Sequence, residues 1–206
     1  MALGGSRFAP VQKGLYRFPM RRIASIYLAG PDLWFPDAAE HDERKRALCE
    51  AAGFRPLTPL DNKPVETQRS EAMARELYAE TAQRLRQADA LIANLTPWRG
   101  PNCDPATAFA TGFMAALGKP VFAYLNVEGE DDADHRERVE RLIGAQPDDA
   151  GVWRDMDGAE VEDFGLPESL MLWVEARRFF VIVTPDPMAE LAGLELSLEA
   201  VRLYAE

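Results

Sequence analysis

Three short segments hold most of the side chains that could carry chemistry: residues 27–35, 60–62 and 94–104. They offer a phenol, carboxylates, amides and aromatic rings, and each segment ends or directly follows an apolar run typical of a buried strand. Ligands of open parallel sheets bind outside the carboxyl ends of the strands, where the strand order reverses. We therefore expect the three segments to meet in one small-molecule site.

Thiol and imidazole groups are few and scattered. The chain has two cysteines, Cys49 and Cys103, and two histidines, with no C-x-x-C spacing and no cluster typical of zinc. Cys49 falls on the apolar face of a predicted helix and is expected in the core. Cys103 directly precedes Asp104, and it is either a replacement nucleophile or an incidental small residue. Asp104 itself would also serve as the N-cap of a helix beginning near Thr107.

The elements that would position these groups alternate along the chain. Strands are predicted at 23–29, 54–57, 90–95, 121–125 and 179–183, and helices at 38–52, 66–87, 107–117 and 189–204. This alternation predicts an α/β fold, a flavodoxin-like doubly wound sheet of five parallel strands with helices on both faces. Residues 1–22 are expected to be an N-terminal arm, and 23–206 a single domain.

Residues 126–160 interrupt this alternation. They contain an acidic run made of Glu128, Glu130, Asp131, Asp132 and Asp134, with Gly and Pro nearby. We expect a solvated, mobile insertion loop here and no metal site, because the run does not match a calcium-loop pattern.

Composition narrows the choice of partners. The chain of 206 residues is 47% hydrophobic and 28% charged, which is typical of a soluble globular protein. Its formal net charge of −11 repels phosphate backbones, so neither nucleic acid nor an anionic membrane is an expected partner. No apolar run reaches the roughly 18 residues that span a bilayer. The expected compartment is the cytoplasm, although the basic, acid-free start of the chain also fits a transit peptide.

Four separated blocks resemble the nucleoside 2-deoxyribosyltransferase family, in family order. They are IYLAGPDLWF at 26–35, PLDN at 59–62, NLTPWRGPNCDPATAFATGFMAALGKPV at 94–121 and FGLPESLML at 164–172. The third block resembles the family pattern D-x-G-T-x-x-E, whose Glu is the nucleophile. The fourth resembles a segment that reaches into a neighbouring subunit's site. The resemblance therefore implies a homodimer or higher homo-oligomer with shared sites.

The resemblance also implies a reaction. Family members transfer a 2-deoxyribosyl group between nucleobases in two steps through a covalent deoxyribosyl-enzyme, without metal or organic cofactor. The implied partners are a 2-deoxynucleoside and a nucleobase. Asp104 matches the aspartate that exchanges a proton with the base, and Tyr27 matches the tyrosine that orients nucleophile and sugar. Trp34 and Phe35 match an aromatic wall for the base. The further substrate-binding positions are Gly30, Asp61, Asn62, Thr81, Asn94, Trp98, Gly100, Ser169 and Met171.

Several positions depart from the family pattern. Ala110 stands at the nucleophile position and Ala106 replaces the pattern's Gly, while Thr81 stands where members carry Asp or Asn and Ser169 where they carry Asn. An alanine side chain cannot attack the sugar, so transfer at the family's rate is not expected from this chain. Loss of a covalent nucleophile costs on the order of 10⁶ in rate in other enzymes.

Three explanations for Ala110 stay open on the sequence alone. The chain is an engineered form in which Glu was replaced, a natural member that diverged, or a protein in which another acid such as Glu80 took over the role. Two alternative functions also stay open. One is a 2-deoxynucleoside or nucleotide N-glycoside hydrolase, for which Arg99 would be a weak phosphate-site candidate. The other is a non-catalytic nucleoside or nucleotide sensor.

Overall fold

Five parallel strands form the centre of the molecule in the computed structural model, which describes residues 22–205. The strands are β1 (Ser25–Ala29), β2 (Arg55–Leu57), β3 (Ala90–Asn94), β4 (Val121–Val127) and β7 (Phe179–Val183). Their order is β2-β1-β3-β4-β7, and every neighbouring pair is parallel. The predicted doubly wound five-stranded sheet is thereby confirmed. The predicted arm lies, except for Arg22, outside the described residues.

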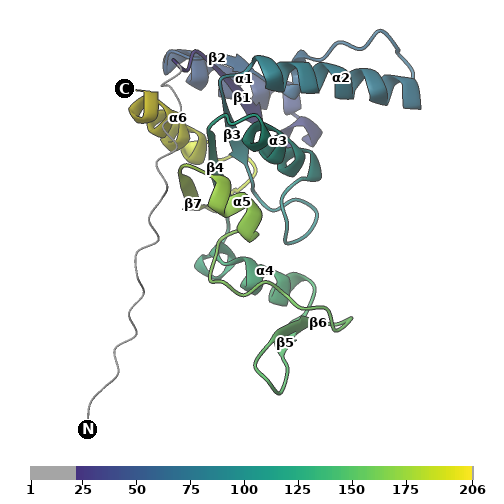
Figure 1. Cartoon of the computed structure of the whole chain (residues 1–206), viewed down its shortest axis with the longest axis vertical. Helices are drawn as coiled ribbons and strands as arrows, with labels where there is room; N and C mark the ends of the chain where they lie inside the picture. Colours follow the sequence, from purple (N-terminus) through teal and green to yellow (C-terminus); the bar gives the residue numbers. More distant parts are fainter. Residues whose placement is uncertain (1–21, 206) are drawn as a thin grey trace.

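Helices cover both faces of this sheet (Figure 1). One face is covered by α1 (Ala38–Ala51) and α6 (Ala192–Ala205), and the other by α2 (Glu71–Gln87), α3 (Pro105–Ala116) and α5 (Leu170–Glu175). All residues of β1, β3 and β4 are buried, as expected for strands sandwiched between helices. Odd-numbered residues of β1 and β3, such as Tyr27 and Leu91, point to the α2–α3 face. Even-numbered ones, such as Ile26 and Ile92, point to the α1–α6 face.

Two helices begin later than the sequence predicts. The α2 helix begins at Glu71, not at 66, because the Ser70 hydroxyl accepts a hydrogen bond from the Met73 amide at 3.2 Å and caps the helix. The α6 helix begins at Ala192, not at 189, because the Glu190 carboxylate accepts from the next two backbone amides at 2.8 Å each. In both cases a side chain that satisfies the first free amides sets the boundary.

The prediction of a solvated loop for residues 126–160 is wrong. Strand β4 continues to Val127, and it is followed by a short 3-10 helix (Glu130–Ala133), α4 (His135–Leu142) and an antiparallel hairpin of β5 (Ala145–Pro147) and β6 (Trp153–Asp155). The hairpin and α4 extend from the sheet at the lower end of Figure 1. Part of the acidic run is structural, since the Asp134 carboxylate caps α4 by accepting from the Glu137 amide at 3.3 Å.

Within residues 22–205, no helix is long and apolar enough to cross a bilayer.

Candidate functional site

A chain of hydrogen bonds joins the loop after β2 to α2, beside Tyr27 of β1. The Arg84 Nε atom donates to Asn62 Oδ1 at 2.8 Å, and Asn62 Nδ2 donates to Thr81 Oγ1 at 2.7 Å. The Thr81 side chain also interacts with the Tyr27 hydroxyl and lowers the pKa of Tyr27. Arg84 also donates through Nη2 to the Asp61 carbonyl at 2.5 Å. The structure therefore brings Tyr27, Asp61, Asn62 and Thr81 together, as the sequence predicts.

The Tyr27 phenol is held neutral by its surroundings. Its side chain is only 2% exposed, and burial raises the pKa of Tyr27 well above its usual value, although Thr81 and the Arg84 charge oppose this shift. Thr81 Oγ1 already accepts from Asn62, so its own proton is free to be donated to the Tyr27 oxygen. In that arrangement the Tyr27 proton is available for an acceptor outside the chain.

Ala110 lies on the buried face of α3. It is 4% exposed and belongs to the same apolar cluster as Tyr27, Leu91 and Met114. The predicted nucleophile position therefore turns toward the sheet, on the face from which Tyr27 projects. Its methyl group can neither attack an anomeric carbon nor accept a proton.

Asp104 caps α3, which confirms the N-cap interpretation. Its Oδ2 atom accepts from the Thr107 amide at 2.9 Å and from the Thr107 hydroxyl at 3.1 Å. The residue is 5% exposed, and within residues 22–205 no donor is paired with its second oxygen, Oδ1. One carboxylate oxygen thus orients the helix, and the other remains available to a ligand.

Glu80 and Cys103, the two candidate replacement nucleophiles, are each held in a state that does not favour attack. Glu80 accepts from the Lys63 amide at 2.8 Å and lies 3.8 Å from the Arg84 guanidinium, so it holds the 62–63 loop. Cys103 is buried, and burial raises the pKa of its thiol to about 12. A protonated, buried thiol is a poor nucleophile at neutral pH. Glu80 is thus held at the 62–63 loop and the Cys103 thiol stays protonated, so neither provides the nucleophile that a Glu at position 110 would.

Gly30 and Asn94 fix the ends of neighbouring strands. A Cβ atom on Gly30 would overlap Asp32 Oδ1 and lie 3.0 Å from the Asn94 Cβ, so a larger residue there would displace the Asp32 side chain. The Asn94 Oδ1 atom accepts from the Thr96 amide at 3.1 Å and from the Thr96 hydroxyl at 2.6 Å. Both predicted site residues therefore shape the loops that surround the site.

Two of the predicted aromatic site residues, Phe35 and Trp98, contact each other. The rings of Phe35 and Trp98 are in contact at 5.7 Å between centroids, whereas Trp34 is 53% exposed. The Arg99 guanidinium lies 5.1 Å above the Trp98 ring, and Arg99 adopts a left-handed φ of 57°. Gly100 follows with φ of 149°, a conformation that favours glycine. Phe35 and Trp98, and not Trp34, form the aromatic contact between the first and third segments.

Ser169 and Met171 do not join this group within the chain. The Ser169 hydroxyl lies 3.4 Å from Glu162, and Ser169 precedes the first residue of α5, while Met171 is 73% exposed. Among the described residues, neither one bonds to the Tyr27 network.

Sequence reasoning missed several charged residues behind the site. Arg84 lies three residues after Thr81 on the same face of α2, and this spacing was the available signal. A buried ion pair joins Lys45 of α1 to Asp32 in the loop after β1, and Asp32 Oδ1 has no partner among the described residues. No periodic pattern connects positions 13 apart in a loop and a helix, so this pair carries no sequence signal.

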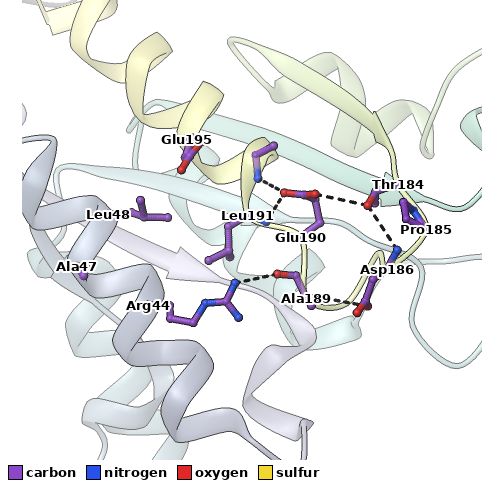
Figure 2. A pocket seen from close by; sticks show the side chains of 11 residues that line it. Arg44, Ala47, Leu48, Thr184, Pro185, Asp186, Ala189, Glu190, Leu191 and Glu195 are labelled. Carbon is purple, nitrogen blue, oxygen red and sulfur yellow. Dashed lines mark hydrogen bonds between the residues drawn. The ribbon is translucent and has the colours of Figure 1, made fainter.

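A separate cavity of about 800 Å³ lies on the α1–α6 face and contains none of the predicted site residues. Figure 2 shows that several of its polar groups are bonded within the chain, whereas no bond is drawn to the Glu195 side chain. Glu190 accepts from backbone amides and lies 3.4 Å from the Thr184 hydroxyl, and Arg44 donates to the Ala189 carbonyl at 3.2 Å. The described residues also contain no group of three His, Cys, Asp or Glu side chains that could hold a metal ion.

The comparisons with known proteins agree with this fold. A sequence profile of the nucleoside 2-deoxyribosyltransferase family matches residues 26–171, and the chain belongs to that family. The solved structure of a 2-desoxiribosyltransferase from Leishmania mexicana is similar, with 29% sequence identity and a TM-score of 0.57 over 85% of this chain and 97% of that one. An uncharacterized protein from Schizosaccharomyces pombe is 33% identical over 106 residues, which is 50% of each chain. This chain therefore spans about half the length of the curated relative it matches.

Proposed function

We propose that the protein binds 2-deoxynucleosides and nucleobases at the carboxyl ends of β1 and β3. We further propose that it transfers the 2-deoxyribosyl group at a rate far below that of family members with a nucleophilic Glu. The observation that carries the proposal is the position of Ala110. Its methyl group lies in the same buried cluster as Tyr27, on the face of α3 that turns toward the sheet.

The binding groups around that position support the first half of the proposal. Tyr27 has a proton to donate, Asp104 keeps one carboxylate oxygen free of described donors, and Phe35 and Trp98 offer aromatic faces. Together they suit a ligand with a planar heterocycle and hydroxyl groups. No metal or cofactor is needed for these contacts.

The absence of a carboxylate at position 110 supports the proposal of slow transfer. The two-step reaction needs a covalent nucleophile at the anomeric carbon. Glu80 is engaged with the Lys63 amide and the Cys103 thiol stays protonated at neutral pH, so neither supplies this nucleophile. We therefore assign the protein to binding, with residual transfer at most.

Calorimetric titration with deoxyinosine and thymidine tests the binding half. We expect saturable binding that weakens in Asp104→Asn, because asparagine can cap the helix as aspartate does but presents an NH2 donor where Asp104 presents a free carboxylate oxygen. A wild-type protein that binds neither nucleoside would overturn the proposal.

A base-exchange assay tests the second half, with the Leishmania mexicana enzyme assayed in parallel. We expect a rate at least ~10³-fold lower for this chain, as for other enzymes without their nucleophile. An equal rate would mean that another group performs the attack.

A second candidate is the binding of 2-deoxynucleotides. The observation that favours it is Arg99, which is exposed and stacked on Trp98, and which forms no ion pair with a carboxylate among the described residues. A guanidinium beside the base contact could bind a 5-phosphate. Tighter binding of the monophosphate than of the nucleoside, lost in Arg99→Gln, would favour this candidate.

The shared site implied by the family segment also stays a proposal. Phe164, Met171 and Val174 are 65%, 73% and 67% exposed, and they lie in or beside that segment. Clustered apolar side chains of this kind are typical of an interface, so we propose that copies of the chain associate through them.

A further inference from the structure

A buried arginine on α4 joins segments that are far apart in the sequence. Arg138 is 1% exposed, and its guanidinium donates through Nε to the Pro101 carbonyl at 3.0 Å and through Nη1 to the Asp132 carbonyl at 2.8 Å. Through Nη2 it donates to the Pro167 carbonyl at 2.7 Å. One rigid side chain therefore fixes three backbone segments at once.

A histidine one turn earlier makes a parallel connection. The His135 Nε2 atom lies 2.8 Å from Asn102 Oδ1, and the His135 amide donates to the Leu166 carbonyl at 2.9 Å. Arg138 and His135 thus contact the same two segments, 101–102 and 166–167. We call these contacts the α4 clamp.

Glu168 supplies the counter-charge for the clamp. Its carboxylate is 1% exposed and lies 3.5 Å from Arg138 Nη2 and 4.0 Å from His135 Nε2. A buried ion pair adds little net stability but penalises any arrangement that separates its members. The pair therefore acts to specify one geometry of the two segments.

The clamped segments lead directly to the candidate site. Residues 97–103 include Trp98, which contacts Phe35. The next residue, Asp104, is the N-cap of α3. The 166–169 segment leads into α5, which packs against α3. Movement of either segment would displace the groups that are proposed to contact the nucleobase.

We propose that Arg138 and His135 are positioning residues, which hold the 97–103 loop against the 166–169 segment in the geometry that binds the nucleobase. The inference rests on the proposed nucleoside binding for its functional part, whereas its structural part stands independently of any ligand. Neither side chain touches the ligand, since both act through the Pro101 carbonyl and the Asn102 side chain.

Amide hydrogen exchange on the ligand-free protein tests the structural part. The Trp98 amide, which donates to the Asn102 carbonyl at 2.9 Å, reports on the loop, and the Trp173 amide, which donates to the Ser169 carbonyl at 3.0 Å, reports on the start of α5. We expect faster exchange at Trp98 in Arg138→Lys and in Asn102→Ala. Because Asn102 is exposed, its variant tests the clamp even if Arg138→Lys fails to fold.

Control variants separate clamping from general destabilisation. Arg141→Lys changes an arginine of the same helix that is 56% exposed and pairs with the Asp132 side chain, and it should leave both amides unchanged. His135→Gln should behave like the wild type, because its amide can still donate to Asn102, whereas His135→Leu should behave like Asn102→Ala. Unchanged exchange at Trp98 in Arg138→Lys and Asn102→Ala would overturn the clamp.

Calorimetric titration with deoxyinosine tests the functional part on the same variants. We expect Asn102→Ala to weaken binding by about 3- to 10-fold, as for the loss of one hydrogen bond, with the thermal midpoint close to that of wild type. Faster exchange with wild-type affinity would show that the clamp exists but does not position the base. If the wild-type protein binds no deoxynucleoside, the proposed function fails, and the exchange data alone decide the clamp.

Discussion

The Thr81 side chain interacts with the Tyr27 hydroxyl, and Thr81 is in turn held by Asn62. Thr81 stands where family members were expected to carry Asp or Asn, so an uncharged hydroxyl performs the contact to Tyr27 here. Arg84 lies at the far end of this network, where it also donates to the Asp61 carbonyl. A site without the nucleophilic carboxylate thus keeps its tyrosine oriented.

We expect Thr81→Val to weaken deoxynucleoside binding by about 3- to 10-fold, because Tyr27 loses the partner that fixes its hydroxyl. Thr81→Val also leaves the Asn62 amide without its acceptor, so the free energy of unfolding should fall by about 1 kcal/mol. Calorimetric titration and urea denaturation measure the two effects. Thr81→Ser keeps the hydroxyl and is the matched control, and equal behaviour of the two variants would contradict the role of this bond.

Both cysteines should make the protein less stable at alkaline pH. Cys49 and Cys103 are buried, and burial raises the pKa of each thiol to about 12. An unfolded thiol ionises near pH 8.5, so above that pH the unfolded chain releases protons that the folded chain retains. The stability that the two buried thiols contribute is therefore fully present below about pH 8.5, and it is lost as the pH rises toward 12. One pH unit above 8.5, each thiol should lower the free energy of unfolding by about 1.4 kcal/mol.

Urea denaturation at pH 7.5 and 9.5 in the presence of a reductant measures this loss. Cys103→Ala should lose less stability between the two pH values than the wild type does, because it lacks one of the titrating thiols. An equal loss in both proteins would assign the alkaline effect to other groups.

Association between copies should depend on the exposed side chains at α5. We expect light scattering at micromolar concentration to report a dimer or larger species, and Val174→Asp to shift it toward the monomer, because a carboxylate in an apolar interface is costly to desolvate. Val65→Asp is the matched control, since Val65 is 89% exposed and lies in the loop before α2. A wild-type monomer that still binds nucleoside would contradict the shared site.

The sequence predicts the sheet well because its signal is local. All five strands were predicted, and β7 lies at the predicted residues, since each is a short apolar run between turn residues. The elements of the 126–160 region were missed because they are short and polar. The fold of residues 126–160 depends on Arg138, which donates to carbonyls 6 and 37 residues away in the sequence. Contacts of this kind leave no periodic pattern in the sequence.

The sequence also predicts those parts of the site that lie in short local blocks. Tyr27, Asn62 and Thr81 follow from the resemblance of short blocks, and the structure does bring them together. The ion pair of Asp32 with Lys45 depends on how α1 packs over the first loop, which no motif encodes. Trp98 contacts Phe35 across two segments that are far apart in the chain, a pairing that no local pattern encodes.

The substitution Ala110→Glu should create or restore cleavage of the N-glycosidic bond. Position 110 faces the sheet on the same side as Tyr27, whose hydroxyl could orient the new carboxylate toward the anomeric carbon. We expect base release from deoxyinosine or thymidine to rise by at least ~10³-fold over the wild type, measured by chromatography of the free base.

Ala110→Gln is the control that separates nucleophilicity from size. Glutamine has nearly the shape of glutamate and buries a similar side chain beside Tyr27, but its amide cannot form the glycosyl ester that the two-step reaction requires. It should therefore remain as inactive as the wild type while folding and binding like the Glu variant. Equal base release from the Gln and Glu variants would mean that the carboxylate is not the nucleophile. An inactive Glu variant that still binds nucleoside would point to Thr81 and Ser169 as changes that had already moved the site away from this reaction.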